Sequence, residues 1–186
     1  MQAGFTLVEV LVALSLMVVL SIGVVQLFAI AIRAGHVSRD RTVAVSLASG
    51  KIEQLRSLEW RVELDPGGGL VRHTDATSNL SVDPAAAGGP GLRQSPAGTL
   101  DTSTPAYVDY LDRFGRRVGS GVSQPVTAVY IRRWAVHHLA ADPDGVVVLQ
   151  VLVVTVQRER TRSAFVPHAW NGEDVLLTTM MARRAR

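Results

Sequence analysis

Residues 5–32 form one apolar block, and no other part of the chain constrains its fold as strongly. Glu9 is the only charged residue in the block, and no proline is present to break a helix. About 20 apolar residues, each rising about 1.5 Å along a helix, cross the roughly 30 Å hydrocarbon core of a membrane. A core helix of a soluble protein is seldom this long. The block therefore predicts a membrane-spanning helix.

A secretory signal peptide would be another use of such a block, with Ala29-Ile30-Ala31 as the cleavage site. The product would be an exported soluble protein cut after Ala31. Signal peptides, however, place basic residues before an apolar stretch of about 7–15 residues. Here the residues before Phe5 include no Lys or Arg, and the apolar stretch is much longer. These two features favour a helix that is retained.

Glu9 is a carboxylate within an otherwise apolar span. By insertion scales such a charge costs on the order of 2.5–3.5 kcal/mol, so it requires a partner. If the chain is cut after Gly4, Phe5 acquires an α-amine four residues before Glu9. Residues separated by four positions share one face of a helix, so the amine and the carboxylate can pair within one chain or with a neighbouring helix. Cleavage would therefore supply the partner that Glu9 needs.

The residues Gly4, Phe5, Thr6, Leu7 and Glu9, followed directly by the apolar helix, closely resemble the prepilin signature of type IV pilins and type II secretion pseudopilins. The resemblance implies that a prepilin peptidase cuts after Gly4 and methylates the new terminus at Phe5. It also implies that Glu9 guides assembly by pairing with the N terminus of an adjacent subunit.

The same resemblance implies a location and a set of partners. The protein would cross the bacterial inner membrane once, with its head on the periplasmic or outer side, and would then enter a pilus or pseudopilus. The expected partners are other pilin or pseudopilin subunits, the prepilin peptidase, the inner-membrane assembly platform and the lipid bilayer.

Three features depart from the family pattern. The leader, residues 1–4, lacks the basic residues that usually orient such proteins, and the nearest ones, Arg33, Arg39 and Arg41, follow the span instead. An upstream start codon with a longer basic leader would explain this. Gln26 stands where many major pilins have a proline, and the chain has no cysteine for their C-terminal pair. The last two departures favour a minor pilin or minor pseudopilin.

The whole chain predicts an α+β fold of pilin-like layout. We expect a leader over 1–4, the span over 5–32, an amphipathic continuation of the helix over 33–64, a Gly/Pro-rich loop over 65–106 and a β-rich head over 107–186. The continuation has apolar residues at three- and four-residue steps, which predict one buried stripe. The stripe comprises Val45, Ala48, Ile52, Leu55 and Leu58 or Glu59, and the polar side comprises Arg39, Asp40, Lys51, Glu53, Gln54 and Arg56.

Strand signals in the head are separated by turn signals. The apolar run 146–156 predicts a central strand, and three or four antiparallel strands are expected to pack against the amphipathic helix. The expected strands cover 106–111, 116–118, 126–139, 146–156 and 174–181, with turns at 112–115 and 142–145.

Candidate metal ligands in the head have structural interpretations that we favour. His137 and His138 are adjacent strand residues and should point to opposite faces, which disfavours a shared metal ion. Asp142 and Asp144 could bind calcium, but the sequence DPDG is more typical of a turn.

Other candidate residues also favour a structural protein. Arg132 and Arg133 could contact DNA or phosphate with the C-terminal arginines, but the net charge is only +3, so a solvated edge is expected and nucleic acid is an unlikely partner. Trp60, Trp134 and Trp170 are expected to be packing residues.

No motif of a catalytic site is present. The chain has no cysteine, and it contains no nucleophile–base pattern, phosphate-binding loop or paired-histidine zinc motif. The sequence therefore predicts an assembly subunit without a cofactor, not an enzyme. A membrane-anchored module that binds DNA or a surface ligand without polymerising is the alternative.

Overall fold

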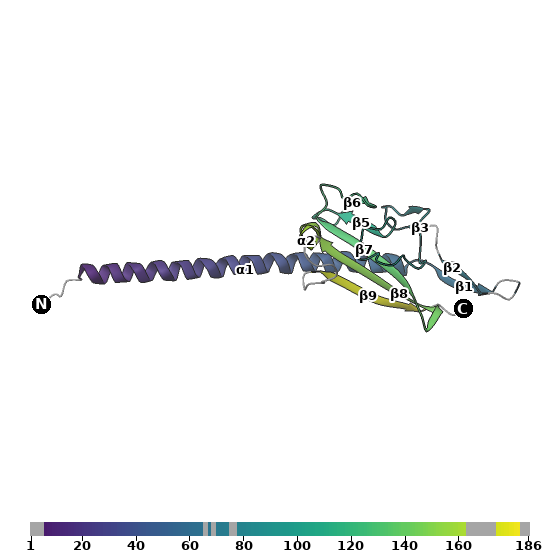
Figure 1. Cartoon of the computed structure of the whole chain (residues 1–186), viewed down its shortest axis with the longest axis horizontal. Helices are drawn as coiled ribbons and strands as arrows, with labels where there is room; N and C mark the ends of the chain where they lie inside the picture. Colours follow the sequence, from purple (N-terminus) through teal and green to yellow (C-terminus); the bar gives the residue numbers. More distant parts are fainter. Residues whose placement is uncertain (1–5, 65–66, 68–69, 75–77, 163–173, 183–186) are drawn as a thin grey trace. The chain divides into compact units, whose positions relative to one another are not determined.

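The computed structural model describes residues 6–64, 67, 70–74, 78–162 and 174–182. The chain divides into two compact units, Met1–Asp40 and Arg41–Arg186. In the first unit the described residues belong almost entirely to helix α1 (Leu7–Arg56), and their side chains are exposed. The second unit, which we call the head, contains the last turns of α1 and all the strands found among the described residues (Figure 1).

Helix α1 ends earlier than predicted. Its last turns close with a bond from Ser57 N to Glu53 O, and the Ser57 hydroxyl donates to Gln54 O. Strand β1 (Trp60–Leu64) follows and pairs with β2 (Leu70–Thr74) in an antiparallel hairpin. The prediction of helix over 57–64 is therefore wrong. The segment WRVEL alternates apolar and polar residues, which suits a strand, and its pairing partner lies beyond the glycines.

The expected loop over 65–106 is also only partly correct. Besides β2, this range contains the short antiparallel pair β3 (Ser78–Asn79) and β4 (Ala86–Ala87). Two-residue strands leave no apolar alternation in the sequence, so composition alone could not reveal them. The other described residues between β2 and β5 form turns and irregular structure.

The main sheet has five strands in the order β6-β5-β7-β8-β9, and every neighbouring pair is antiparallel. This exceeds the three or four strands expected, although each predicted strand is present. The run at 146–156 is indeed an interior strand. The strands are β5 (Val108–Leu111), β6 (Arg117–Ser120), β7 (Tyr130–Leu139), β8 (Asp142–Thr155) and β9 (Val175–Ala182), with the short helix α2 (Val156–Arg162) between β8 and β9.

The turns at the ends of this sheet are set by short polar side chains. Asp112 Oδ1 accepts from Phe114 N at 2.8 Å and Arg116 N at 2.9 Å, which closes the predicted β5–β6 turn. The β7–β8 connection turns at residues 140–141, because Leu139 already pairs with Asp142. The turn therefore comes two residues before the predicted 142–145.

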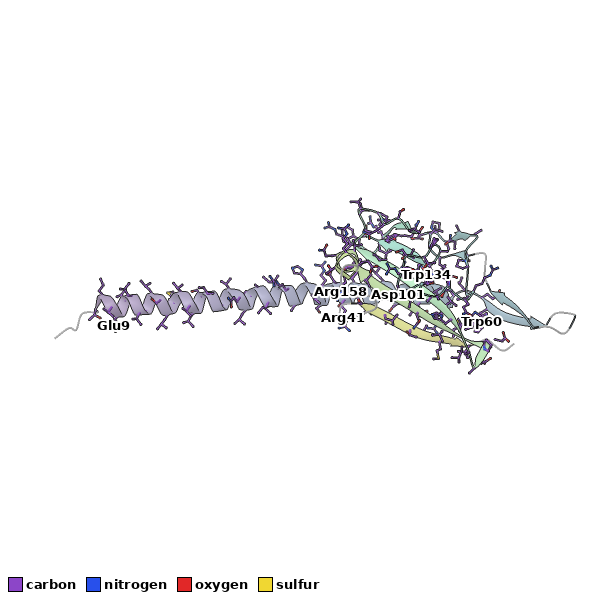
Figure 2. The ribbon with its side chains drawn as sticks, viewed as in Figure 1. Glu9, Arg41, Trp60, Asp101, Trp134 and Arg158 are labelled. Atoms are coloured by element: carbon purple, nitrogen blue, oxygen red, sulfur yellow. The ribbon has the colours of Figure 1, made fainter. Side chains whose placement is uncertain are left out.

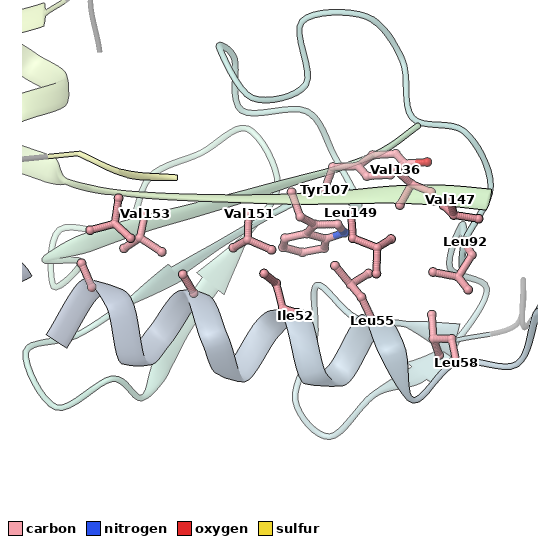
Figure 3. Packing of buried hydrophobic residues seen from close by; sticks show 14 of the residues in the cluster. Ile52, Leu55, Leu58, Leu92, Tyr107, Val136, Val147, Leu149, Val151 and Val153 are labelled. Atoms are coloured by element: carbon pink, nitrogen blue, oxygen red, sulfur yellow. The ribbon is translucent and has the colours of Figure 1, made fainter. Parts of the chain in front are cut away.

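One face of the sheet packs on α1. Ile52 and Leu55 point toward Leu149 and its neighbours on β8, and Leu58, just beyond the helix, lies beside Leu92 in the same cluster (Figure 3). The predicted stripe is correct for four of its positions, whereas Val45 is 40% exposed and Ala44 is buried in its place. Successive residues lie about 100° apart around a helix. The exchange of Val45 for Ala44 therefore shifts the buried face at the start of the stripe. The packing confirms an α+β arrangement consistent with a pilin-like fold.

Candidate functional site

Thr6 begins helix α1 as its N-cap. The Thr6 hydroxyl accepts from Glu9 N at 3.3 Å, and Thr6 O accepts from Glu9 N at 3.1 Å and Val10 N at 3.3 Å. A threonine followed three residues later by glutamate is the capping-box pattern, and a carboxylate in the first turn interacts favourably with the helix dipole. The Glu9 backbone therefore takes part in starting the helix, and its carboxylate lies in the first turn, at the positive end of the helix dipole. Sequence reasoning missed this, although the spacing Thr6–Glu9 signals it.

The apolar part of α1 has no protein neighbour within the described residues. Leu7, Leu20 and Phe28, for example, are 79%, 70% and 65% exposed, although they lie on different sides of the helix. The helix is long and apolar enough to cross a membrane. Exposed apolar surface of this extent needs a bilayer or other helices around it. Gly4 and Phe5, the predicted processing residues, lie outside the described residues.

Within the head, one buried charge cluster joins the helix to the sheet. Lys51 Nζ on α1 lies 2.9 Å from Asp109 Oδ2 on β5, and both side chains are 1% exposed. Arg132 on β7 binds the same carboxylate with two bonds, Nε to Oδ1 at 2.9 Å and Nη2 to Oδ2 at 2.8 Å. Asp109 and Arg132 are register partners on adjacent strands, so the sheet itself holds them together. We call Lys51, Asp109 and Arg132 the buried triad.

Backbone and aromatic groups complete the buried triad. Lys51 Nζ donates to Leu80 O at 2.6 Å, and Arg132 Nη1 donates to Leu47 O on α1 at 2.9 Å. The Lys51 ammonium also lies 4.2 Å from the centroid of the Trp134 ring, a cation–π contact. Buried charges are tolerated when they are paired and hydrogen-bonded, and these contacts meet that condition.

The buried triad holds two cations and one anion away from water. Burial lowers the pKa of Lys51 to about 8, and the repulsion of Arg132 adds to this, while Asp109 acts in the opposite direction. The Lys51 donors are directed at Asp109 and Leu80 O, with its charge over Trp134, which leaves little of the ammonium for a substrate. The arrangement is suited to fixing the helix on the sheet, and it contains no nucleophile–base–orienter geometry.

Lys51 corrects the sequence analysis, which placed it on the polar side of the helix. It lies three residues after Ala48 and four before Leu55, and both of these are fully buried. That spacing is the available signal, but a lone lysine in such a stripe normally extends to solvent. Only the carboxylate of Asp109, supplied by a strand far along the chain, allows it to stay buried.

Arg132 and Arg133 are not the solvated edge that was expected. Both are buried, on opposite faces of the sheet, and Arg133 Nη2 lies 2.6 Å from Glu159 Oε1 on α2. Arg133 also donates to Ser103 Oγ at 3.2 Å. Because these guanidinium groups are engaged inside the head, neither is available to bind phosphate. The C-terminal arginines lie outside the described residues.

The two histidines do not form a metal site together. His138 lies 3.0 Å from Pro143 O through Nδ1 and 3.4 Å from Leu92 O through Nε2, with its ring edge-on to Trp60. His137 points to the other sheet face, as the strand alternation predicted. Trp60 and Trp134 are buried packing residues, as predicted, and Trp170 lies outside the described residues.

Asp142 has a local structural role. Its Oδ1 accepts from Gly145 N at 2.8 Å, so the carboxylate closes the start of β8. The part of the chain that the structure describes contains no group of three His, Cys, Asp or Glu side chains placed to hold a metal ion. Calcium at Asp142 and Asp144, which the sequence analysis disfavoured, is not tested by the structure.

The N-terminal residues match a known family model. Residues 1–25 fit the prokaryotic N-terminal methylation motif, which includes Gly4, Phe5 and Glu9. The chain carries a type IV pilin-like prepilin signature. With the apolar helix, this signature supports a type IV pilin-like or pseudopilin protein that a single membrane pass anchors. Searches of curated proteins and of solved structures found no match. Figure 2 locates Glu9 near the start of α1, and Trp134 within the head.

Proposed function

We propose that this protein is a structural subunit, a minor pilin or minor pseudopilin, that enters a type IV pilus or type II secretion pseudopilus through its N-terminal helix. In this proposal a prepilin peptidase removes residues 1–4 and methylates Phe5. An inner-membrane assembly platform then moves the subunit from the bilayer into the filament. The protein is not an enzyme and needs no cofactor.

The observation that carries the proposal is the coincidence of the methylation motif with an apolar helix exposed on all sides. The motif ends at residue 25, within the apolar block, so the processed terminus and the span form one unit. Helix–helix packing in a filament would cover the same side chains that lipid covers in the membrane. The helix can thus exchange one apolar environment for the other at little hydrophobic cost.

Glu9 is proposed to pair with the N-terminal amine of an adjacent subunit. The capping-box spacing of Glu9 from Thr6 offers a competing explanation, in which the Glu9 side chain only stabilises the first turn. The two explanations differ in what they require. In a capping box either a glutamate or a glutamine side chain can reach the backbone N–H of the cap residue, here Thr6, but glutamine carries no charge to attract an amine.

The test compares Glu9→Gln with Glu9→Ala. We expect both variants to insert in the membrane and neither to enter filaments, as measured by subunit content of sheared or overproduced filaments. Glu53→Gln, an exposed glutamate near the end of the same helix, serves as the matched control and should assemble normally. Normal assembly of Glu9→Gln would refute the ion-pair role.

A further inference from the structure

One end of the head concentrates basic side chains. The β5–β6 turn carries exposed Arg113 and Arg116, and its backbone approaches α1 so closely that a Cβ on Gly115 would lie 2.9 Å from Leu47 Cδ2. Arg41, the first residue of the head, lies less than two helical turns before Leu47 on α1. The turn and the start of the head therefore lie at the same end.

Helix α2 begins at this end as well. Val156 N donates to Val129 O, and Val129 N donates to Leu111 O, so the start of α2 lies beside the end of β5. Arg160, on α2, is exposed. Among the acidic residues near this end, Glu159 pairs with Arg133 and Asp174 lies 3.5 Å from Arg158. Asp112 accepts two backbone N–H groups of the turn, and Asp40 directly precedes Arg41. We call Arg41, Arg113, Arg116 and Arg160, together with Phe114, the basic end.

An exposed aromatic ring accompanies these charges. Phe114 is 75% exposed, and the guanidinium carbons of Arg113 and Arg116 lie 5.8 Å and 5.9 Å from its ring centroid. The carboxylate of Asp112 holds the turn that carries Phe114, because it accepts a hydrogen bond from Phe114 N. A rigid turn that presents a ring between two arginines resembles the anchors that proteins place at a membrane–water interface.

The basic end is close to the membrane along the chain. Arg41 is nine residues after Ile32, the last residue of the apolar block. The block, residues 5–32, measures about 42 Å as a helix and exceeds the roughly 30 Å hydrocarbon core. A span that is too long accommodates by tilting, and interfacial basic and aromatic residues help to set the tilt.

We propose that the basic end binds the phosphate headgroups of anionic phospholipids while the protein is held in the membrane. The membrane anchor keeps the lipid surface at a high effective concentration. Even a weak attraction between the basic end and the headgroups is therefore enough for binding. Binding would hold the head against the bilayer until assembly extracts the helix. This inference requires only the membrane anchoring, and not the assembly, in the proposed function.

A single reporter cysteine can test this binding, because the chain has no native cysteine. Val126→Cys, at a side chain that is 98% exposed in the loop before β7, would carry a dye, with the full chain in nanodiscs that contain a lipid-attached acceptor. Energy transfer is then compared between phosphatidylcholine alone and phosphatidylcholine with phosphatidylglycerol. A dye at Ala140→Cys, in the exposed turn between β7 and β8, is the positional control.

We expect phosphatidylglycerol to increase energy transfer at Val126→Cys more than at Ala140→Cys, and added salt to reverse the increase. Each basic residue near an anionic surface contributes about fivefold to the docking equilibrium constant, so Arg113→Gln with Arg116→Gln should lower that constant roughly 25-fold. Arg93→Gln, at an exposed arginine on the loop between β4 and β5, is the control for Arg113→Gln alone, since each removes one charge, and it should change nothing.

Equal energy transfer in the two lipid mixtures would overturn the proposal, and this comparison needs no arginine variant to fold. A loss of docking in Arg93→Gln as large as that in Arg113→Gln would also overturn the proposal. The effect would then depend on net charge and not on the basic end. Binding of a short single-stranded DNA through Arg113 and Arg116, without any response to phosphatidylglycerol, would point to nucleic acid instead. If the chain docks on lipid but never enters filaments, the lipid-binding proposal stands and the proposed assembly role is refuted.

Discussion

Lys51 Nζ and Asp109 Oδ2 lie 2.9 Å apart with both side chains almost completely buried, so a single ion pair ties helix α1 to strand β5. The partners are 58 positions apart in the chain. Arg132 shares the carboxylate, and Trp134 covers the ammonium. The buried triad thus links the helix to the sheet inside an otherwise apolar interface. Its contacts predict how substitutions and pH change the stability of the head.

Loss of Asp109 should harm the head more than loss of Lys51. Asp109→Asn leaves two buried cations without an anion and should cost about 3–5 kcal/mol in the free energy of unfolding. Lys51→Met leaves Asp109 bound twice by Arg132 and unpairs mainly Leu80 O, at about 1–2 kcal/mol. Urea unfolding of the full chain in detergent, followed by tryptophan fluorescence, measures both. Equal losses would contradict the shared-anion arrangement.

The stability of the head should rise with pH above about 8. The pKa of Lys51 is about 8 in the folded chain and returns to its ordinary value of 10.5 on unfolding, so between these values the unfolded state binds more protons. The gain should be a few kcal/mol at most by pH 10. Burial raises the pKa of Tyr107, so above pH 10 its ionisation opposes the gain.

The control for this pH dependence is Lys51→Met, measured by urea unfolding at pH 7.5, 8.5 and 9.5. Lys51 is the only lysine in the chain, so no other ammonium side chain titrates in this range. The variant should lose the rise in stability. A rise of the same size in the variant would assign the pH dependence to another group.

Alanine substitutions at two glycines with similar backbone angles can distinguish the cost of backbone strain from the cost of side-chain crowding. Gly115 and Gly121 have φ of 77° and 82°, where a side chain costs roughly 1 kcal/mol. A Cβ on Gly121 meets nothing within 4 Å, whereas one on Gly115 would lie 2.9 Å from Leu47 Cδ2. Gly115→Ala should therefore destabilise the head more than Gly121→Ala, by about 1 kcal/mol. Adding Leu47→Ala should shrink this difference in a double-mutant cycle by thermal melting.

Processing should depend on Gly4. A bulky residue such as Gly4→Leu should leave residues 1–4 attached, because the peptidase would no longer accept the cleavage site. Intact-mass spectrometry would then show a heavier protein than the wild type, whose mature terminus should be N-methylated Phe5. A wild-type terminus at Ile32 would instead identify an exported protein cut after Ala31.

The local patterns of the sequence determined much of the architecture. The apolar block predicted the long helix, and the residues Ala48, Ile52 and Leu55 predicted the buried stripe, because helical periodicity is a property of neighbouring residues. Alternation of apolar and polar residues located the strand within 126–139, and the continuous apolar run located the strand within 146–156. The prepilin signature lies within a few adjacent residues and needs no fold to be recognised.

The end of α1 and the two-residue strands could not be predicted from the same patterns. Trp60 belongs to a strand because β2 pairs with β1, and the residues of β3 and β4 acquire their structure only from each other. Strand pairing is a relation between segments, so composition along one segment does not determine it.

The sequence by itself therefore determined the membrane-type helix, the processing signature with Glu9, and the α+β class. The tertiary structure decided where the charges go. Lys51 and Arg132 are ordinary surface residues by type, and they are buried only because strand β5 brings the carboxylate of Asp109 between them. The free energy of a buried charge depends on partners within a few ångströms, and only the folded chain brings those partners together.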